Sequence, residues 1–316
     1  MCSFLKVKQN TLRQRRGVIV NGVLLVKMKI MHKIVIYTSS HLRTTPKTVC
    51  IANAISKALG DLGIEHRELN NTNDYWCRDY MPVLLSDDGV YAKYKYNPDY
   101  LKDYITKQKY ITEQDVACRD LNICTPTDLG IVFDGGNYVR CDDKVIMTDK
   151  IFMENPEWKP LDLLSHLTEK LSVEIILLPW DMYDFCGHAD GMVASLGGNK
   201  ILLNNCWKNK DKEFHKRLTK ILEPHFDIVE PVYNCKEDKN SWCYLNYLQL
   251  PNAILLPVLS KNADCDNDIA AIETFSRLFP LLKIIPIYSR PLIEDGGALH
   301  CVTWEFVENL NVSHKL

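Results

Sequence analysis

Four short segments of the 316-residue chain combine glycine or tryptophan with side chains that do acid–base or nucleophilic chemistry. They read DYWCRDYMP at 74–82, FDGGN at 133–137, CGHAD at 186–190 and EDGGALHC at 294–301. Glycine lets the backbone turn sharply and expose a neighbouring polar group. We therefore take these segments as the candidate functional residues of the chain.

The residue types in these segments suit a cationic substrate. The thiolate of Cys301 is a nucleophile, and His188 can protonate a leaving group. Asp79 and Asp190 would repel an anion, but each can accept paired N–H bonds from a planar guanidinium group. The same charges raise the pKa of the Cys301 thiol in the empty site, and a bound cation lowers it again. The pattern thus predicts a guanidinium site with a cysteine nucleophile.

The spacing of the polar residues suggests a repeat. Asp79, Asp134, His188, Asn246 and Cys301 follow one another at intervals of 55, 54, 58 and 55 residues. A fixed period is typical of repeated supersecondary units that bury their apolar faces together. Five ββαβ-like units around an axis would each deliver one polar residue to a shared centre.

Short apolar strands alternate with helices, which predicts one α/β domain over residues 31–316. Predicted strands lie at 33–38, 90–96, 129–133, 144–147, 173–178, 200–203, 252–257 and 283–287, and predicted helices at 45–62, 161–171, 215–222 and 266–279. Residues 1–30 are predicted to be an N-terminal extension, poorly ordered or an over-long start. Asn21 interrupts their apolar run and lysines follow it, unlike a signal peptide.

Composition excludes several classes of protein. The net charge of -2 provides no electrostatic footprint for nucleic acid, and the absence of an apolar run of 18 residues argues against a membrane span. The twelve cysteines include no CxxC pair, so a zinc ribbon has no support. We expect mostly reduced cysteines and a cytoplasmic location.

WCRDYMP, DGGN, GHAD and GGALHC, with Tyr244-Leu-Asn246 as a Tyr-x-Asn element, resemble the agmatine deiminase and Porphyromonas-type peptidyl-arginine deiminase family of guanidine-modifying enzymes. The resemblance covers about residues 33–310. It implies the pentein fold, a five-bladed α/β propeller with pseudo-fivefold symmetry. It also implies a small cationic guanidino substrate and no metal or organic cofactor. Relatives often form homo-oligomers, and the sequence leaves the oligomeric state open.

The resemblance implies three catalytic residues. Cys301 would attack the guanidinium carbon and form a covalent thiouronium adduct. His188 would protonate the departing amine and then activate a water. Asp134 stands where most agmatine deiminase relatives have Glu and would orient His188 through its second ring nitrogen. Because Asp is one methylene shorter, the contact between Asp134 and His188 is open: direct, water-bridged or of another kind.

The resemblance also implies four substrate-binding residues. Asp79 and Asp190 would clamp the guanidinium nitrogens. Trp76 would wall the site and pack on the cationic plane, and Asn246 would contact the substrate or shape the pocket.

Three other polar residues lie outside these assignments, and two of them, the lysines, are open to two interpretations. Lys93 and Lys95 share one face of a predicted strand. They would bind a substrate carboxylate if that face lined the pocket, or form an ordinary solvated face. His300 would point away from Cys301 on a strand, so we expect a structural role for it.

The predicted activity is hydrolysis of a guanidino group to a ureido group with release of ammonia, with agmatine to N-carbamoylputrescine as the leading reaction. Free arginine or peptidyl-arginine is the next choice of substrate. An amidinotransferase would use the same nucleophile, and a non-catalytic binding protein could use the same scaffold. A cysteine peptidase or amidase would need an oxyanion hole and no carboxylate clamp.

Overall fold

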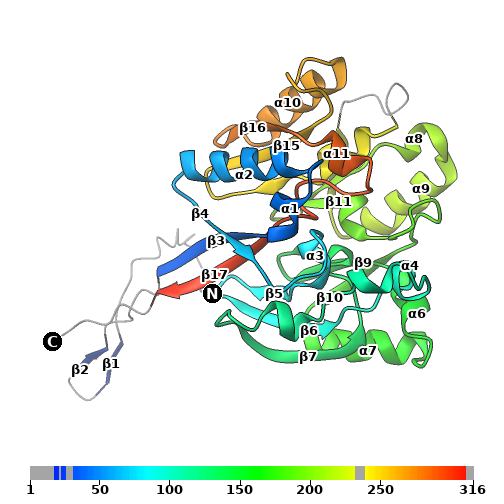
Figure 1. Cartoon of the computed structure of the whole chain (residues 1–316). Helices are drawn as coiled ribbons and strands as arrows, with labels where there is room; N and C mark the ends of the chain where they lie inside the picture. The colour runs from blue at the N-terminus through cyan, green and yellow to red at the C-terminus, as the bar shows by residue number, and fades with distance from the viewer. Residues whose placement is uncertain (1–17, 21–22, 26–30, 232–238, 311–316) are drawn as a thin grey trace, which may run out of the picture.

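The computed structural model describes residues 18–20, 23–25, 31–231 and 239–310 (Figure 1). Most of the predicted extension at 1–30 lies outside these ranges. Its described part is a hairpin of two antiparallel strands, β1 (Val18–Val20) and β2 (Val23–Leu25). None of the described helices is long and apolar enough to cross a membrane.

Five three-stranded sheets share one topology among the described residues. In each sheet the middle strand pairs antiparallel with one neighbour and parallel with the other. In spatial order they are β17 (Trp304–Leu310), β3 (Met31–Ser39) and β4 (Glu65–Leu69); β5 (Val83–Ser86), β6 (Val90–Lys95) and β7 (Cys124–Val132); β8 (Val139–Cys141), β9 (Lys144–Thr148) and β10 (Glu174–Leu178); β11 (Val193–Gly197), β12 (Lys200–Leu203) and β13 (Asp227–Val229); and β14 (Leu248–Gln249), β15 (Ala253–Val258) and β16 (Lys283–Tyr288).

Helices fill the crossover between the two parallel strands of each sheet, as parallel pairing requires. They are α1 (Ser40–Thr44), α2 (Val49–Asp61), α4 (Asp99–Lys102), η1 (Gln108–Tyr110), α5 (Gln114–Ala117), α6 (Lys150–Glu154), α7 (Pro160–Leu171), α8 (Trp207–Lys210), α9 (Lys212–Leu222) and α10 (Asp266–Leu278). The units are therefore ββαβ-like, as the period predicts. The helix predicted at 45–62 was placed too early at its start. In the structure α1 ends at Thr44, and α2 begins at Val49.

A short turn precedes the first strand of each sheet and carries the polar motif of that unit. Four of these turns are helical: α3 (Cys77–Tyr80), η2 (Gly135–Asn137), η3 (Ala189–Gly191) and η4 (Ser241–Leu245). The fifth follows α11 (Arg290–Ile293) and contains Cys301 just before β17. The repeat of about 55 residues is thus the distance between equivalent turns, and these turns position the site.

The last described strand completes the sheet of the first unit. β17 pairs antiparallel with β3, so Trp304 lies opposite Tyr37, and Figure 1 shows the red strand beside the blue one. Trp304 is 2% exposed, and its Nε1 donates to the carbonyl of Pro82 at 2.8 Å. The ends of the fold are thereby joined to each other and to the neighbouring unit.

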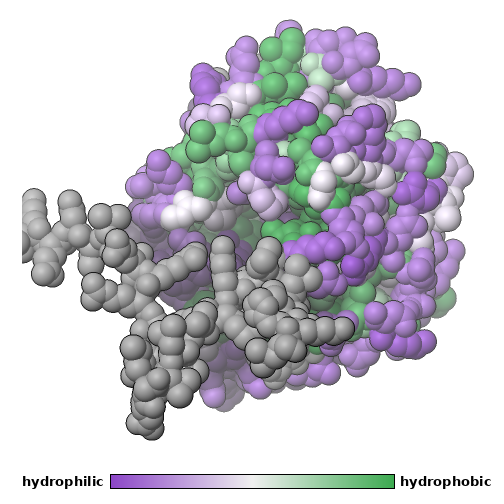
Figure 2. Space-filling view, turned by 90° about the vertical axis from the view of Figure 1, so that its left-hand side faces the viewer, coloured by the Kyte–Doolittle hydropathy of each residue, from purple (hydrophilic) through white to green (hydrophobic). Residues whose placement is uncertain are grey.

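Apolar side chains from the sheets and helices form the buried clusters of the core. On the face shown in Figure 2, hydrophilic residues predominate around the edge and hydrophobic residues gather nearer the middle. Apolar atoms contribute much of the accessible surface of any folded protein, so apolar residues on this face are expected.

Candidate active site

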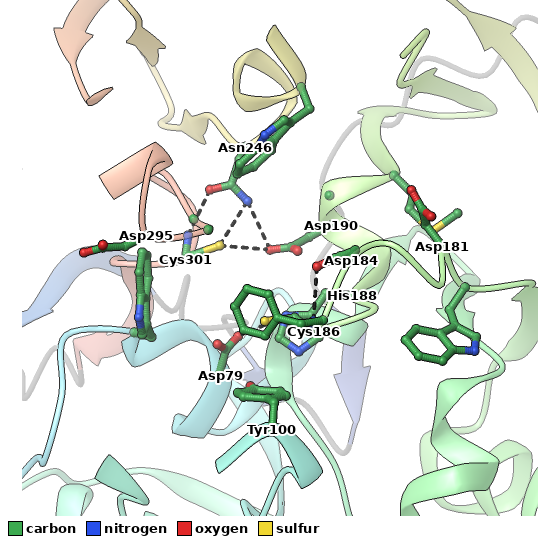
Figure 3. A pocket seen from close by; sticks show the side chains of 18 of the residues that line it. Asp79, Tyr100, Asp181, Asp184, Cys186, His188, Asp190, Asn246, Asp295 and Cys301 are labelled. Carbon is green, nitrogen blue, oxygen red and sulfur yellow. Dashed lines mark hydrogen bonds and ion pairs between the residues drawn. The ribbon is translucent and has the colours of Figure 1, made fainter. Parts of the chain in front are cut away.

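Four of the five polar turns line one cavity of about 1710 Å³, and the fifth, η2, lies behind His188. Asp79, His188, Asp190, Asn246 and Cys301 all line it, and each is less than a tenth exposed. In Figure 3, Asn246, Cys301 and Asp190 are joined by dashed lines, with Asp79 and His188 across the cavity. The structure therefore brings together residues that are more than 200 positions apart in sequence.

Asn246 holds the loop of the candidate nucleophile. Its Nδ2 donates to Cys301 Sγ at 3.2 Å and to Asp190 Oδ2 at 3.4 Å. Its Oδ1 accepts from the backbone N–H groups of Ala298 and Cys301 at 3.1 and 3.2 Å. These four hydrogen bonds connect the side chain of Asn246 to the thiol and backbone of the Cys301 turn and to Asp190.

His188 lies between two carboxylates. Its Nε2 donates to Asp134 Oδ2 at 2.9 Å, and its Nδ1 is 3.6 Å from Asp79 Oδ1. The shorter Asp134 thus reaches the ring directly. Gly136 leaves the space in which Asp79 and His188 approach each other, because a Cβ at this position would lie 2.8 Å from Asp79 Oδ1 and closer still to His188 Nδ1. With Nε2 taken by Asp134, Nδ1 is the ring nitrogen that faces the cavity.

Burial and charge change the proton affinities of this pair. Burial, with Asp134 and Asp190 nearby, raises the pKa of Asp79 to about 8 against the opposing effect of His188. Burial lowers the pKa of His188, but Asp79 and Asp134 outweigh it and raise the pKa to about 10. The empty site therefore keeps His188 protonated at neutral pH and disfavours ionisation of Asp79.

The pKa of the Cys301 thiol is raised well above its usual value, first by burial and then by Asp190 and Asp79. Its Sγ lies 3.9 Å from Asp190 Oδ2. In the empty site Cys301 is therefore a thiol, and it needs added positive charge to become a nucleophile.

His300 contacts the site, contrary to the expected structural role. Its Nδ1 donates to Asp190 Oδ2 at 2.7 Å. The expectation was wrong because residues 299–302 form a turn and not a strand, so neighbouring side chains do not alternate between faces. Burial raises the pKa of Asp190, but the hydrogen bond and charge of His300 outweigh it and lower the pKa below its usual value. Asp190 is thus the carboxylate kept ionised.

Trp76 forms part of the cavity wall, as predicted. Its ring packs against Gly297 so closely that a side chain there would overlap it. Arg78, from the same motif, has a different role. Its backbone N–H donates to the carbonyl of Cys301 at 3.1 Å, and its guanidinium pairs with Glu305 at 3.2 Å. Arg78 therefore holds the Cys301 turn in place through its backbone hydrogen bond and its ion pair with Glu305.

Lys93 and Lys95 do not line the cavity. Lys93 Nζ lies 3.9 Å from Asp115 and 3.6 Å from Asp128, and Lys95 is exposed. The interpretation of these lysines as ligands of a substrate carboxylate is wrong. The strand face that carries Lys93 and Lys95 is the ordinary solvated face that was the other interpretation.

Two residues of the cavity were missed by the motifs. The hydroxyl of Tyr100 donates to Asp134 Oδ2 at 3.0 Å, and Asp184 lines the cavity two residues before Cys186. Neither lies beside a glycine, so the sequence offers no signal for them. Among the residues described, no cluster of three or more His, Cys, Asp or Glu side chains could hold a metal ion.

Comparisons with known proteins agree on one family. The model of the Porphyromonas-type peptidyl-arginine deiminase family matches residues 27–306. A putative agmatine deiminase of Mycoplasma mycoides is 22% identical over 78% of each chain, and the agmatine deiminase of Pseudomonas aeruginosa is 22% identical over 83% of each.

The fold is also found in a solved structure. The agmatine deiminase of Enterococcus faecalis superposes with a TM-score of 0.68 at 16% identity, covering 89% of this chain and 94% of that one. At this identity the likeness concerns the fold. The match of the family model over most of the length, with its motifs gathered around one cavity, means that the chain belongs to the Porphyromonas-type peptidyl-arginine deiminase family.

Proposed function

We propose that this protein is a guanidine deiminase that hydrolyses agmatine to N-carbamoylputrescine and ammonia through a covalent adduct on Cys301. One observation carries the proposal: the Cys301 thiol and the Asp79 and Asp190 carboxylates line a single cavity around His188. A planar cation bound by both carboxylates would present its central carbon to the thiol between them. A cysteine peptidase needs no pair of carboxylates beside its thiol, so this pair favours a guanidino substrate.

Binding of the guanidinium activates the nucleophile. Its positive charge offsets Asp190 and Asp79, which raise the pKa of Cys301 in the empty site, so the thiol gives its proton to solvent and ionises beside the substrate. Sγ then bonds to the guanidinium carbon, and the bond from that carbon to a terminal nitrogen breaks. His188 gives its proton to this nitrogen, which leaves as ammonia. Cys301 is left carrying a thiouronium group.

Water completes the reaction. It adds to the thiouronium carbon and gives a proton to His188, which Asp134 holds in place through Nε2. The carbon–sulfur bond then breaks, its electron pair returns to Cys301, the added hydroxyl gives its remaining proton to solvent, and the ureido product departs. One water is consumed and one ammonia is formed per substrate. Retention of this water step is what separates a deiminase from an amidinotransferase.

Acidic side chains outnumber the basic ones in the cavity lining, which favours agmatine over arginine. Asp74 and Asp184 line the cavity in addition to Asp79 and Asp190. Burial raises the pKa of Asp184, and the hydrogen bond from the backbone N–H of Cys186 at 3.1 Å only partly offsets this. A second cation, such as the terminal amine of agmatine, would be stabilised there, whereas the carboxylate of arginine would be repelled.

The test is a parallel assay of agmatine, free arginine and a peptide ending in arginine, with ammonia and ureido product both measured. We expect turnover of agmatine, loss of turnover in Cys301→Ala, and a KM for agmatine raised about tenfold in Asp184→Asn, which removes one charged contact. Ureido product from arginine alone would refute the choice of agmatine. Transfer of the amidino group to an added amine without ammonia would refute the hydrolase.

We further propose that the five sheets are the blades of an α/β propeller with pseudo-fivefold symmetry, because they repeat one topology and deliver equivalent turns to one cavity. We also place the reaction in a reducing compartment, the cytoplasm. Nine cysteines within the described ranges are free thiols, and free thiols are typical of a reducing compartment, which supports this location.

A further inference from the structure

Tyr100 is in contact with the general acid but with none of the reacting atoms. It lies in α4, where its hydroxyl donates to Asp134 Oδ2 at 3.0 Å. The same oxygen accepts from His188 Nε2 at 2.9 Å. Asp134 Oδ1 is also buried, yet no hydrogen-bond partner for it exists among the residues described. Both hydrogen bonds of this carboxylate thus converge on one oxygen.

A network of charges around the buried Lys150 holds Tyr100 in this position. Asp99 Oδ1 accepts from the backbone N–H of Tyr100 at 2.8 Å and pairs with Lys150 Nζ at 2.9 Å. Lys150 is 1% exposed, pairs with Glu154 at 3.1 Å, and places its Nζ 4.8 Å from the centre of the Tyr100 ring. Burial of an ion pair is costly unless its partners are fixed. This network therefore fixes the start of α4 and the direction of the Tyr100 hydroxyl.

Aromatic contacts complete the setting of Tyr100. Its ring meets that of Phe185 edge to face, with centroids 5.6 Å apart, and that of His188 at 6.2 Å. Figure 3 shows Tyr100 next to His188 and Asp79, on the side of the cavity away from Asn246. Removal of the hydroxyl alone would leave these ring contacts and the cation over the ring in place.

We propose that Tyr100 is a positioning residue for His188: its hydroxyl fixes the short Asp134 side chain and, by sharing the same oxygen, restrains the proton affinity of the imidazole. This inference rests on the proposed deiminase function. A hydrogen bond to a carboxylate draws negative charge away from its other partners. With Tyr100 in place His188 is a stronger acid, better able to protonate the departing nitrogen. Without it, the full charge of Asp134 acts on His188.

Other ionisable groups also face His188, and the proposed variant leaves all of them in place. They are Asp79 from α3, Asp134 before η2, Asp184 before the GHAD segment, Asp190 in η3 and Glu154 with Lys150 from α6. A change in the titration of His188 in Tyr100→Phe can therefore be assigned to the hydroxyl.

The first measurement is titration of His188 by NMR in protein labelled with 13C-histidine, with the resonance assigned by its loss in His188→Asn. Compared with the unsubstituted protein, Tyr100→Phe is expected to raise the midpoint by about half to one pH unit, the size of one net hydrogen bond. Tyr138→Phe is the matched control, because its hydroxyl donates only to the carbonyl of Leu84 at 3.3 Å. An unchanged or lowered midpoint in Tyr100→Phe overturns the proposal.

The second measurement is the pH profile of agmatine turnover. Tyr100→Phe should lower kcat about tenfold with KM changed less than twofold, and should move the basic limb of kcat to higher pH. Tyr138→Phe should leave the limb where it is. A lower kcat with an unmoved limb means a purely structural role and overturns the proposal. If no variant turns over agmatine, the deiminase function fails, and the titration still decides the role of Tyr100.

Discussion

Cys301 is close to carboxylates that oppose its ionisation. Its Sγ lies 3.9 Å from Asp190 Oδ2, and Asp79 also raises the pKa of the thiol. A cysteine meant to react with neutral reagents would have cationic neighbours instead. In the proposed mechanism the Cys301 thiol therefore stays protonated and unreactive until a cationic substrate binds beside it.

Alkylation tests this state of the thiol. Because the pKa of Cys301 is raised above 9, the thiolate fraction is small at pH 7 and increases as the pH rises. The rate of carbamidomethylation of Cys301 by iodoacetamide should therefore climb through pH 9 without a plateau, as followed by peptide mass spectrometry. Exposed Cys50 serves as the internal reference. A rate for Cys301 that levels off below pH 8 would contradict the account.

The two clamp carboxylates provide a second prediction. Asp79→Asn and Asp190→Asn each remove a charged partner of the guanidinium, and we expect kcat/KM for agmatine to fall by about two to three orders of magnitude. The control is Asp128→Asn, an exposed carboxylate that faces Lys93. Activity within tenfold of normal in either clamp variant would rule out the paired clamp and favour amide hydrolysis.

The site residues that the sequence could predict are those in glycine-containing motifs at equivalent repeat positions. Tyr100 and Lys150 act on the site from crossover helices, and their contacts depend on packing between distant segments. His300 lies beside Cys301 in sequence, yet its role was misjudged. The error came from assuming strand alternation where the chain turns.

The turn before each first strand is the element that does the positioning. Asp134, just before η2, places a carboxylate at His188 Nε2, and Gly136 within η2 leaves room beside His188 Nδ1. An extra methyl group at Gly136 would lie 2.8 Å from Asp79 Oδ1 and nearer to His188 Nδ1. The absence of a side chain at Gly136 is therefore needed to leave space for Asp79 and His188 within the site.

Gly136→Ala tests the geometry of this turn. We expect kcat to fall at least a hundredfold, because misplacing the reacting groups by about 1 Å has effects of this size, while the circular dichroism spectrum stays that of the folded protein. Gly60→Ala is the control, since α2 has open space at that position and alanine favours a helix. Full activity in Gly136→Ala would show that His188 and Asp79 need not approach this closely.

Strands with continuous apolar residues, such as β9 and β15, were predicted within a residue or two of their ends. β4 was missed because its sequence, EHREL, is mostly charged. In the sheet, Glu65 and Arg67 pair with each other and with Lys33 and Glu308, so ion pairs replace apolar alternation. Very short strands such as β8 and β14 carry too few residues to show any period.

The whole molecule is held together by the return of the chain to its first unit. β17 completes the sheet of β3, and Trp304 connects that sheet to Pro82 in the next unit. Its ring stacks with that of Phe306 at 5.7 Å. Because Cys301 directly precedes this strand, closure of the fold and placement of the nucleophile depend on the same segment.

Truncation of this tryptophan tests the closure. Trp304→Ala should lower the free energy of unfolding by about 3–5 kcal/mol, as expected for a buried tryptophan, and the loss would appear in urea denaturation as a lower midpoint. Leu281→Ala is the control, because Leu281 is 94% exposed. A loss below about 1 kcal/mol for Trp304→Ala would mean that the closing strand contributes little to stability.

The most direct test of the account is to trap the covalent step. The protein is mixed with agmatine, quenched with acid during turnover and digested, and the peptide that contains Cys301 is weighed by mass spectrometry. We predict a gain equal to the mass of agmatine less ammonia, located on Cys301 and absent from Cys301→Ala. Steady release of ammonia and N-carbamoylputrescine with this peptide unmodified, or turnover retained in Cys301→Ala, would contradict the assignment of Cys301 as the nucleophile.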